Sequence, residues 1–150
     1  MSATQALTFS TIVVAGFTSC AEFGSFAFVH PVLRRLPYAQ QVLVEQGLVR
    51  TFGRVMPFLM TGSLMLLVAW ASLQSTAPGV LVALCITCWA VGLASTVVVN
   101  VGINVRTARW RHTDESSWAA MRRRWELFQG VRASAFLASF VLLSAAVTTA

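Results

Sequence analysis

The chain has 150 residues, of which 57% are hydrophobic and 11% charged; soluble domains average about 25% charged residues, so an ordinary soluble domain and a disordered tail are excluded. The mean hydropathy of +0.72 indicates an integral membrane protein, and the length fits three or four spans of about 20 residues without a second domain. All eleven cations are arginines, and in such a protein the net charge of +6 indicates orientation in the membrane rather than nucleic-acid binding.

The first apolar run, residues 7–29, contains a single acid, Glu22. It is too long for the apolar region of a signal peptide, and residues 1–5 lack the basic residues that open one. We therefore expect a retained transmembrane helix. Pro31 and Pro37 should end it and begin the first connection.

The second span is residues 56–73. Residues 40–54, which precede it, have apolar side chains at helical spacing with polar ones between them. This amphipathic pattern is typical of a helix at the membrane interface. We expect the two to be continuous, with a kink at Pro57.

The third span, residues 80–105, follows a short polar turn at 74–79. A charged loop and a second amphipathic stretch, residues 118–126, lead to the fourth span at 127–147. The predicted fold is thus an all-α integral membrane four-helix bundle with two amphipathic connections.

Four spans place both connections on one side of the membrane and both termini on the other. Every arginine lies in or near those two connections, and arginine-rich loops face the cytoplasm. We expect a bacterial inner (plasma) membrane protein with both termini outside. A bundle this small is also a candidate for homo-oligomerisation.

Several polar side chains fall within the spans. Glu22 lies about 12 Å along the helix axis from the end of the first span, and Arg132 lies a similar distance into the fourth. A charged side chain in the bilayer costs about 2.5–3.5 kcal/mol, so such groups are paired or line a cavity. Helical spacing groups Glu22 with Phe26 and His30. The other polar candidates are Arg50, Arg54, Asn100, Asn104 and Gln129. We expect them to form one polar pocket in the cytoplasmic half of the bundle.

Purely structural roles are open for the same residues. Glu22 and Arg132 could form an interhelical lock, the two asparagines could be hydrogen-bonding glue, and His30 could anchor the helix at the interface. The run at 122–124 fits an orientation signal that contacts lipid headgroups. The sequence contains no nucleotide-binding, zinc or GxSxG motif, and Cys85-Ile-Thr-Cys88 is its one textual redox motif.

The segment Asn100-Val-Gly-Ile-Asn104, followed by Trp110, Trp118, Arg124-Trp125-Glu126 and Val131-Arg132, resembles the anthrone oxygenase-like family of small membrane proteins. The end of the first span, His30-Pro31, is also similar. The resemblance covers nearly the whole chain and is strongest over residues 97–135. Gly102 stands where the family usually has proline, and Gln129-Gly130 stands where many members have Asn-His.

The resemblance implies an oxygenase of secondary metabolism that acts on a lipophilic, electron-rich, anthrone-like molecule. Proton abstraction would give an anion that reacts with O₂, and no cofactor is predicted. Glu22 or His30 would be the base, and Arg132 with the asparagines would stabilise the oxyanion. The predicted substrate-binding residues are Phe23, Phe26, Arg50, Arg54, Asn100, Asn104, Trp125, Phe128 and Gln129.

Three other classes stay open. A metal- or haem-dependent oxidase would use His30 with Glu22 or His112. A thiol–quinone oxidoreductase would use Cys85 and Cys88. The chain could also be a non-catalytic subunit or a small transporter. The partners expected for the oxygenase are the lipophilic substrate, O₂ and membrane lipid.

Overall fold

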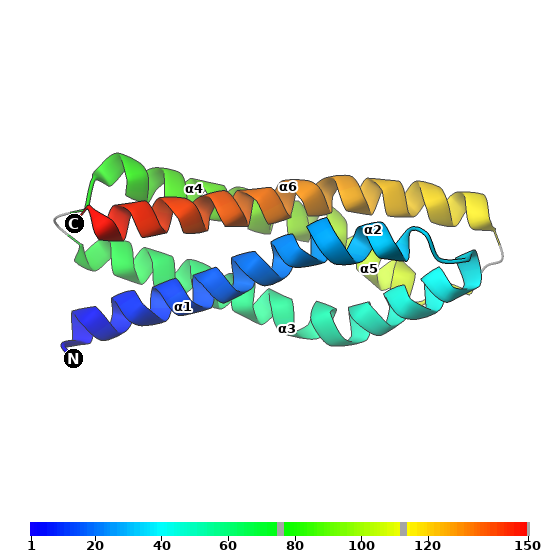
Figure 1. Ribbon diagram of the computed structural model, residues 1–150, viewed down its shortest axis with the longest axis horizontal. Coiled ribbons are helices and arrows are strands. Elements are labelled where there is room, and N and C mark those ends of the chain that lie inside the picture. Colours follow the sequence, from blue (N-terminus) through cyan, green and yellow to red (C-terminus); the bar gives the residue numbers. More distant parts are fainter. Residues whose placement is uncertain (75–76, 112–113, 150) are drawn as a thin grey trace.

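The computed structural model describes residues 1–74, 77–111 and 114–149. It has four long helical segments packed side by side (Figure 1). The first joins α1 (Ala3–Gly24), the π-helical turn η1 (Ser25–Val29) and α2 (His30–Leu33); the second is α3 (Tyr38–Leu73); the third joins α4 (Gly79–Ser95), the π-helical turn η2 (Thr96–Asn100) and α5 (Val101–Ala108); the fourth is α6 (Glu115–Thr148). Each segment is long and apolar enough to cross a membrane. The expected all-α four-helix bundle is confirmed.

The two amphipathic stretches are extensions of the spans, because α3 and α6 run through them without a break. At 1.5 Å per residue the 36 residues of α3 extend about 54 Å, well beyond the roughly 30 Å of bilayer hydrocarbon. Pro57 lies inside α3, where it cannot donate a hydrogen bond to the Gly53 carbonyl. The helix bends near its middle (Figure 1).

The first segment runs on to Leu33, beyond the end expected at residue 29. The π turn is the reason. The His30 N–H donates to the Ser25 carbonyl, five residues back, and Pro31 then falls in the first turn of α2, where a missing N–H costs little.

Buried positions recur at alternating spacings of three and four residues, the pattern of left-handed helix packing. In α6 this series is Trp118, Arg122, Trp125, Gln129, Arg132, Phe136, Ser139, Leu143 and Ala146, and Ala133 is buried in addition to it. The Phe136 ring fits against Gly92 of α4, where a Cβ would lie 2.6 Å from it. The packing therefore requires glycine at position 92.

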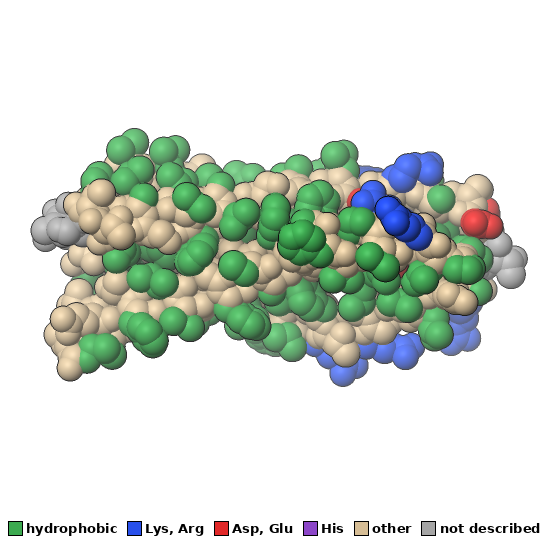
Figure 2. Space-filling model, in the orientation of Figure 1, with side chains coloured by type: hydrophobic (Ala, Val, Ile, Leu, Met, Phe, Trp, Pro, Cys, Tyr) green, Lys and Arg blue, Asp and Glu red, His purple; other side chains and the backbone are tan. Residues whose placement is uncertain are grey.

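The charges gather at one end of the bundle, away from both termini (Figure 2). Nine of the eleven arginines are exposed there; Arg122 and Arg132 are buried. Asp114 caps the start of α6 at this end, and its carboxylate accepts hydrogen bonds from the backbone N–H groups of Ser116 and Ser117. Hydrogen bonds from the hydroxyls of Ser117 and Ser116, together with these backbone bonds, lower the pKa of Asp114 to about 2.

Candidate functional site

A cavity of ≈ 410 Å³ opens between the helices in the charged half of the bundle. Six of the predicted site residues line it: Glu22, His30, Asn104, Trp125, Gln129 and Arg132. The remaining lining residues are Ser25, Glu45, Leu48, Val49, Phe52, Gly53, Met56, Pro57, Met60, Thr96, Val101, Val105, Ala108 and Arg109. All four helical segments contribute, and most of the lining is apolar.

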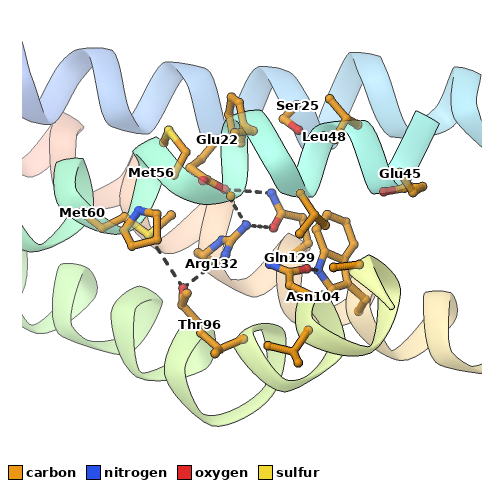
Figure 3. A pocket seen from close by; sticks show the side chains of 18 of the residues that line it. Glu22, Ser25, Glu45, Leu48, Met56, Met60, Thr96, Asn104, Gln129 and Arg132 are labelled. Carbon is orange, nitrogen blue, oxygen red and sulfur yellow. Dashed lines mark hydrogen bonds and ion pairs between the residues drawn. The ribbon is translucent and has the colours of Figure 1, made fainter. Parts of the chain in front are cut away.

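The deeper part of this cavity is built around Glu22, which is fully buried. Its Oε2 lies 2.9 Å from Nη2 of Arg132 and accepts a hydrogen bond from Nε2 of Gln129, also at 2.9 Å. Arg132 donates in turn to Gln129 Oε1 and, over 3.4 Å, to the Thr96 hydroxyl (Figure 3). Helices α1 and α6 and the η2 turn therefore meet in one connected polar network.

Two buried polar atoms of this network have no hydrogen-bond partner among the described residues. One is Glu22 Oε1, an acceptor; the other is Arg132 Nε, a donor. Both residues line the cavity. An unpaired buried polar atom costs about 1–3 kcal/mol, so a ligand that pairs with both would be favoured.

A second ion pair lies toward the charged end. Arg122 Nη2 donates to Glu45 Oε1 over 2.7 Å, and His30 Nδ1 lies 3.3 Å from the same oxygen. All three side chains are buried. The Trp125 ring contacts two of them: its centroid is 4.1 Å from the Arg122 guanidinium carbon and 4.6 Å from the His30 ring centroid. Trp125 also donates to Asn104 Oδ1 over 2.7 Å, which fixes its ring at the cavity.

The other predicted site residues lie outside this lining. Arg50 and Arg54 are exposed on α3, and Phe23 is half-buried. Asn100 is fully buried, and its amide nitrogen and oxygen have no partner in the described chain. Phe128 packs on the cluster that includes Trp125. Phe26 packs against Gly130, where a Cβ would lie 3.0 Å from its ring.

Sequence reasoning missed Glu45, Arg122 and Thr96. A signal existed for Arg122: it lies three residues before Trp125, in register with the stripe predicted for α6. Three successive arginines favour a headgroup contact instead, and this pattern conceals the buried position among them. Glu45 is the one acid in the amphipathic stretch of α3 and gave no comparable signal.

The π turns explain how distant residues reach one cavity. Glu22 and His30 are eight positions apart, with η1 between them. Thr96, the first residue of η2, and Asn104 are also eight positions apart. In an uninterrupted α-helix eight positions leave side chains about 80° apart, whereas seven leave them within about 20°. A π turn holds about one residue more than an α turn, so both pairs face the cavity.

The residues of the alternative functions lie elsewhere. Cys85 is buried in the apolar core and donates to the Ser139 carbonyl over 3.3 Å, and neither it nor Cys88 lines the cavity. Within the described ranges no group of three or more His, Cys, Asp or Glu side chains could hold a metal ion. His112 lies outside the described residues.

Comparison of the chain with protein-family models, with curated proteins and with solved structures finds no match. The resemblance to the anthrone oxygenase-like family is therefore carried by its motif residues alone. The four candidate transmembrane helices indicate an integral membrane protein with a polar site inside the bundle.

Proposed function

We propose that the chain is a membrane-embedded oxygenase that converts an activated CH₂ group of a lipophilic, anthrone-like aromatic ketone into a carbonyl with O₂. One observation carries the proposal: a buried carboxylate with a free oxygen stands beside a guanidinium with a free N–H in a largely apolar cavity. A carbon acid conjugated to a ketone needs both groups, a base for its proton and a donor for the oxygen that becomes negative.

The chemistry balances without a further reductant. Glu22 Oε1 removes a proton from the CH₂ group, and the negative charge moves to the ketone oxygen, which accepts from Arg132 Nε. The electron-rich anion transfers electrons to O₂ and forms a carbon–oxygen bond. The resulting peroxide takes back the proton held by Glu22 to give a hydroperoxide. Loss of the second C–H proton with cleavage of the O–O bond releases water and leaves the new carbonyl. One CH₂ and one O₂ become one C=O and one H₂O.

The network around Glu22 supports this assignment of roles. Arg132 and Gln129 both hold Oε2, which leaves Oε1 for the substrate. Pairing with Arg132 offsets part of the cost of burying the carboxylate. Trp125, Phe52 and Met56 line the apolar part of the cavity, where they would contact the rings of the substrate.

The shallower cluster connects the protonated Glu22 with the aqueous phase, so that protons can be exchanged in either direction during the reaction. His30 and Glu45 line the same cavity and lie on the side of Glu22 nearer the charged end. Histidine exchanges protons near neutral pH. We assign His30 and Glu45 to proton exchange between Glu22 and the aqueous phase. By the positive-inside rule, the charged end faces the cytoplasm.

The test is oxygen uptake by the full chain in lipid nanodiscs supplied with a hydroxylated anthrone. We expect turnover with one O₂ consumed per quinone formed, and a loss of at least about 100-fold in Glu22→Gln, the usual scale for a missing general base. Glu115→Gln makes the same chemical change on an exposed carboxylate and should keep full activity.

Two results would contradict the proposal. Full activity of a folded Glu22→Gln variant would remove Glu22 as the base. A stoichiometric metal or a haem absorption band in the active preparation would favour the metal-dependent alternative.

A further inference from the structure

A second cavity, of ≈ 300 Å³, lies on the other side of His30 from the first. It is lined by Phe26, His30, Arg34, Arg123, Glu126 and Leu127, and so lies between the end of the first helical segment and α6. Arginine side chains border exposed apolar ones on the face formed by α1, α2 and α6 (Figure 2). The proposed oxygenase reaction uses none of these side chains except His30.

The depth of this cavity matches the boundary between acyl chains and headgroups. Counted back along α6 from Val147, about 30 Å of hydrocarbon at 1.5 Å per residue ends near Leu127. Arg123 lies one turn further, within the headgroup layer. The cavity therefore has an apolar side at acyl-chain depth and a cationic side at phosphate depth.

The cationic side has unused hydrogen-bonding capacity. Arg34 Nη1 donates to Glu126 Oε2 over 3.2 Å, and the side chain is 55% exposed, so its other guanidinium N–H groups are available to a ligand. Arg123 is exposed and makes no hydrogen bond or ion pair with any described residue. Two arginines against one glutamate leave a net positive site, and guanidinium forks match phosphate oxygens.

The apolar side is shaped and accessible. The Phe26 ring rests on Gly130, which has no side chain to push it outward. Leu127 is 66% exposed beside it, and Val131, one turn deeper, is 44% exposed. These side chains form an apolar track that continues from the arginines toward the centre of the membrane.

We propose that this cavity binds one anionic phospholipid of the leaflet at the charged end. The phosphodiester lies between Arg34 and Arg123, and an acyl chain follows Phe26 and Leu127. Glu126 orients Arg34 and disfavours a second anion. His30 lines both cavities, so the bound lipid lies against the side of His30 that faces away from the substrate cavity.

The test is native mass spectrometry of the detergent-solubilised full chain titrated with phosphatidylglycerol, phosphatidylcholine or glycerol 3-phosphate. We expect one tightly retained phosphatidylglycerol and at least about tenfold weaker binding in the double variant Arg34→Gln/Arg123→Gln. The matched control, Arg50→Gln/Arg54→Gln, removes the same charge from α3, outside the second cavity, and should bind as the native chain does.

Each other outcome overturns the proposal. Equal loss in both double variants would mean non-specific attraction to a charged surface. Equal retention of phosphatidylcholine would remove the headgroup preference, and equally tight glycerol 3-phosphate would mean a site for a free phosphate. Leu127→Gln changes an exposed side chain and keeps both arginines. It therefore tests the acyl-chain contact even if the double arginine variant fails to fold. Unchanged affinity in this variant would contradict that contact.

Discussion

The two buried arginines differ from the other nine in having a buried acid as partner: Arg132 pairs with Glu22, and Arg122 pairs with Glu45. Charges leave water only at a cost of several kcal/mol, which a close partner offsets. Each pair therefore holds two helices at a fixed separation, whatever chemistry it also performs. For the Glu45–Arg122 pair this structural contribution can be measured separately.

We predict that Arg122→Met destabilises the bundle by about 3–5 kcal/mol, because it leaves Glu45 buried without its partner. Glu45→Met should cost a similar amount by stranding Arg122. The double variant should recover most of the loss, since no uncompensated charge remains. Thermal unfolding in one detergent measures all three variants.

Arg124→Met is the matched control, because Arg124 is exposed on the same helix and should change stability by less than about 0.5 kcal/mol. If the losses of the two single variants simply add in the double variant, Arg122 and Glu45 are not coupled, and the pair is not the source of stability.

At this scale the sequence predicted the Glu22–Arg132 part of the site, and His30, Asn104 and Trp125 of the shallower part, but not the Glu45–Arg122 pair. Charge at bilayer depth was enough to predict that Glu22 and Arg132 share a polar pocket, because few alternatives exist for such groups. Glu45 lies in a stretch whose position relative to the membrane depends on α3 continuing unbroken. That Glu45 pairs with Arg122 could not be inferred from the sequence, because the pairing depends on how α3 packs against α6.

At the scale of the elements, the two π turns change the rotation of the helix that follows each of them. Each lies at the level of the main cavity, and each is followed by a continuation that stays in register with the bundle. The continuous apolar runs located the four spans, but they could not show an extra residue in a single turn. Both turns lie within apolar runs where side chains on every face are compatible with lipid.

This interpretation predicts different effects for two single-residue deletions in the same helical segment. Val98 lies in η2 and is 80% exposed, whereas Val91 lies in α4 and is 49% exposed. Deleting Val98 should convert the π turn into an α turn and keep the bundle folded, because Thr96 and Asn104 would then be seven apart. Deleting Val91 should rotate the residues on one side of it by about 100° and unfold the segment.

Size-exclusion profiles and thermal unfolding of the two variants decide the matter. Similar, severe loss in both would show that η2 is not a simple one-residue insertion, and the alignment of the cavity residues would need another cause.

At the scale of the whole molecule, the charge distribution is the dominant feature. The end that carries both termini has no Asp, Glu, Arg or Lys side chain, and every exposed arginine lies toward the opposite end (Figure 2). The positions of the arginines in the sequence were sufficient to predict this polarity, because every one lies in or near the two connections on one side of the four spans. The structure adds that the main cavity and the second cavity, where we propose the lipid binds, both lie toward the arginine-rich end.

Orientation follows from this polarity and is directly testable with single added cysteines. We predict that Ala3→Cys is labelled by a membrane-impermeant maleimide added to intact cells, because both termini face outward under the positive-inside rule. Ala120→Cys, exposed at the arginine-rich end, should be labelled only after permeabilisation. Cys20, Cys85 and Cys88 lie within the spans, so the native chain serves as the blank. The reverse labelling pattern would place the cavity and its proton route on the outer side, where the substrate would have to arrive from outside the cell.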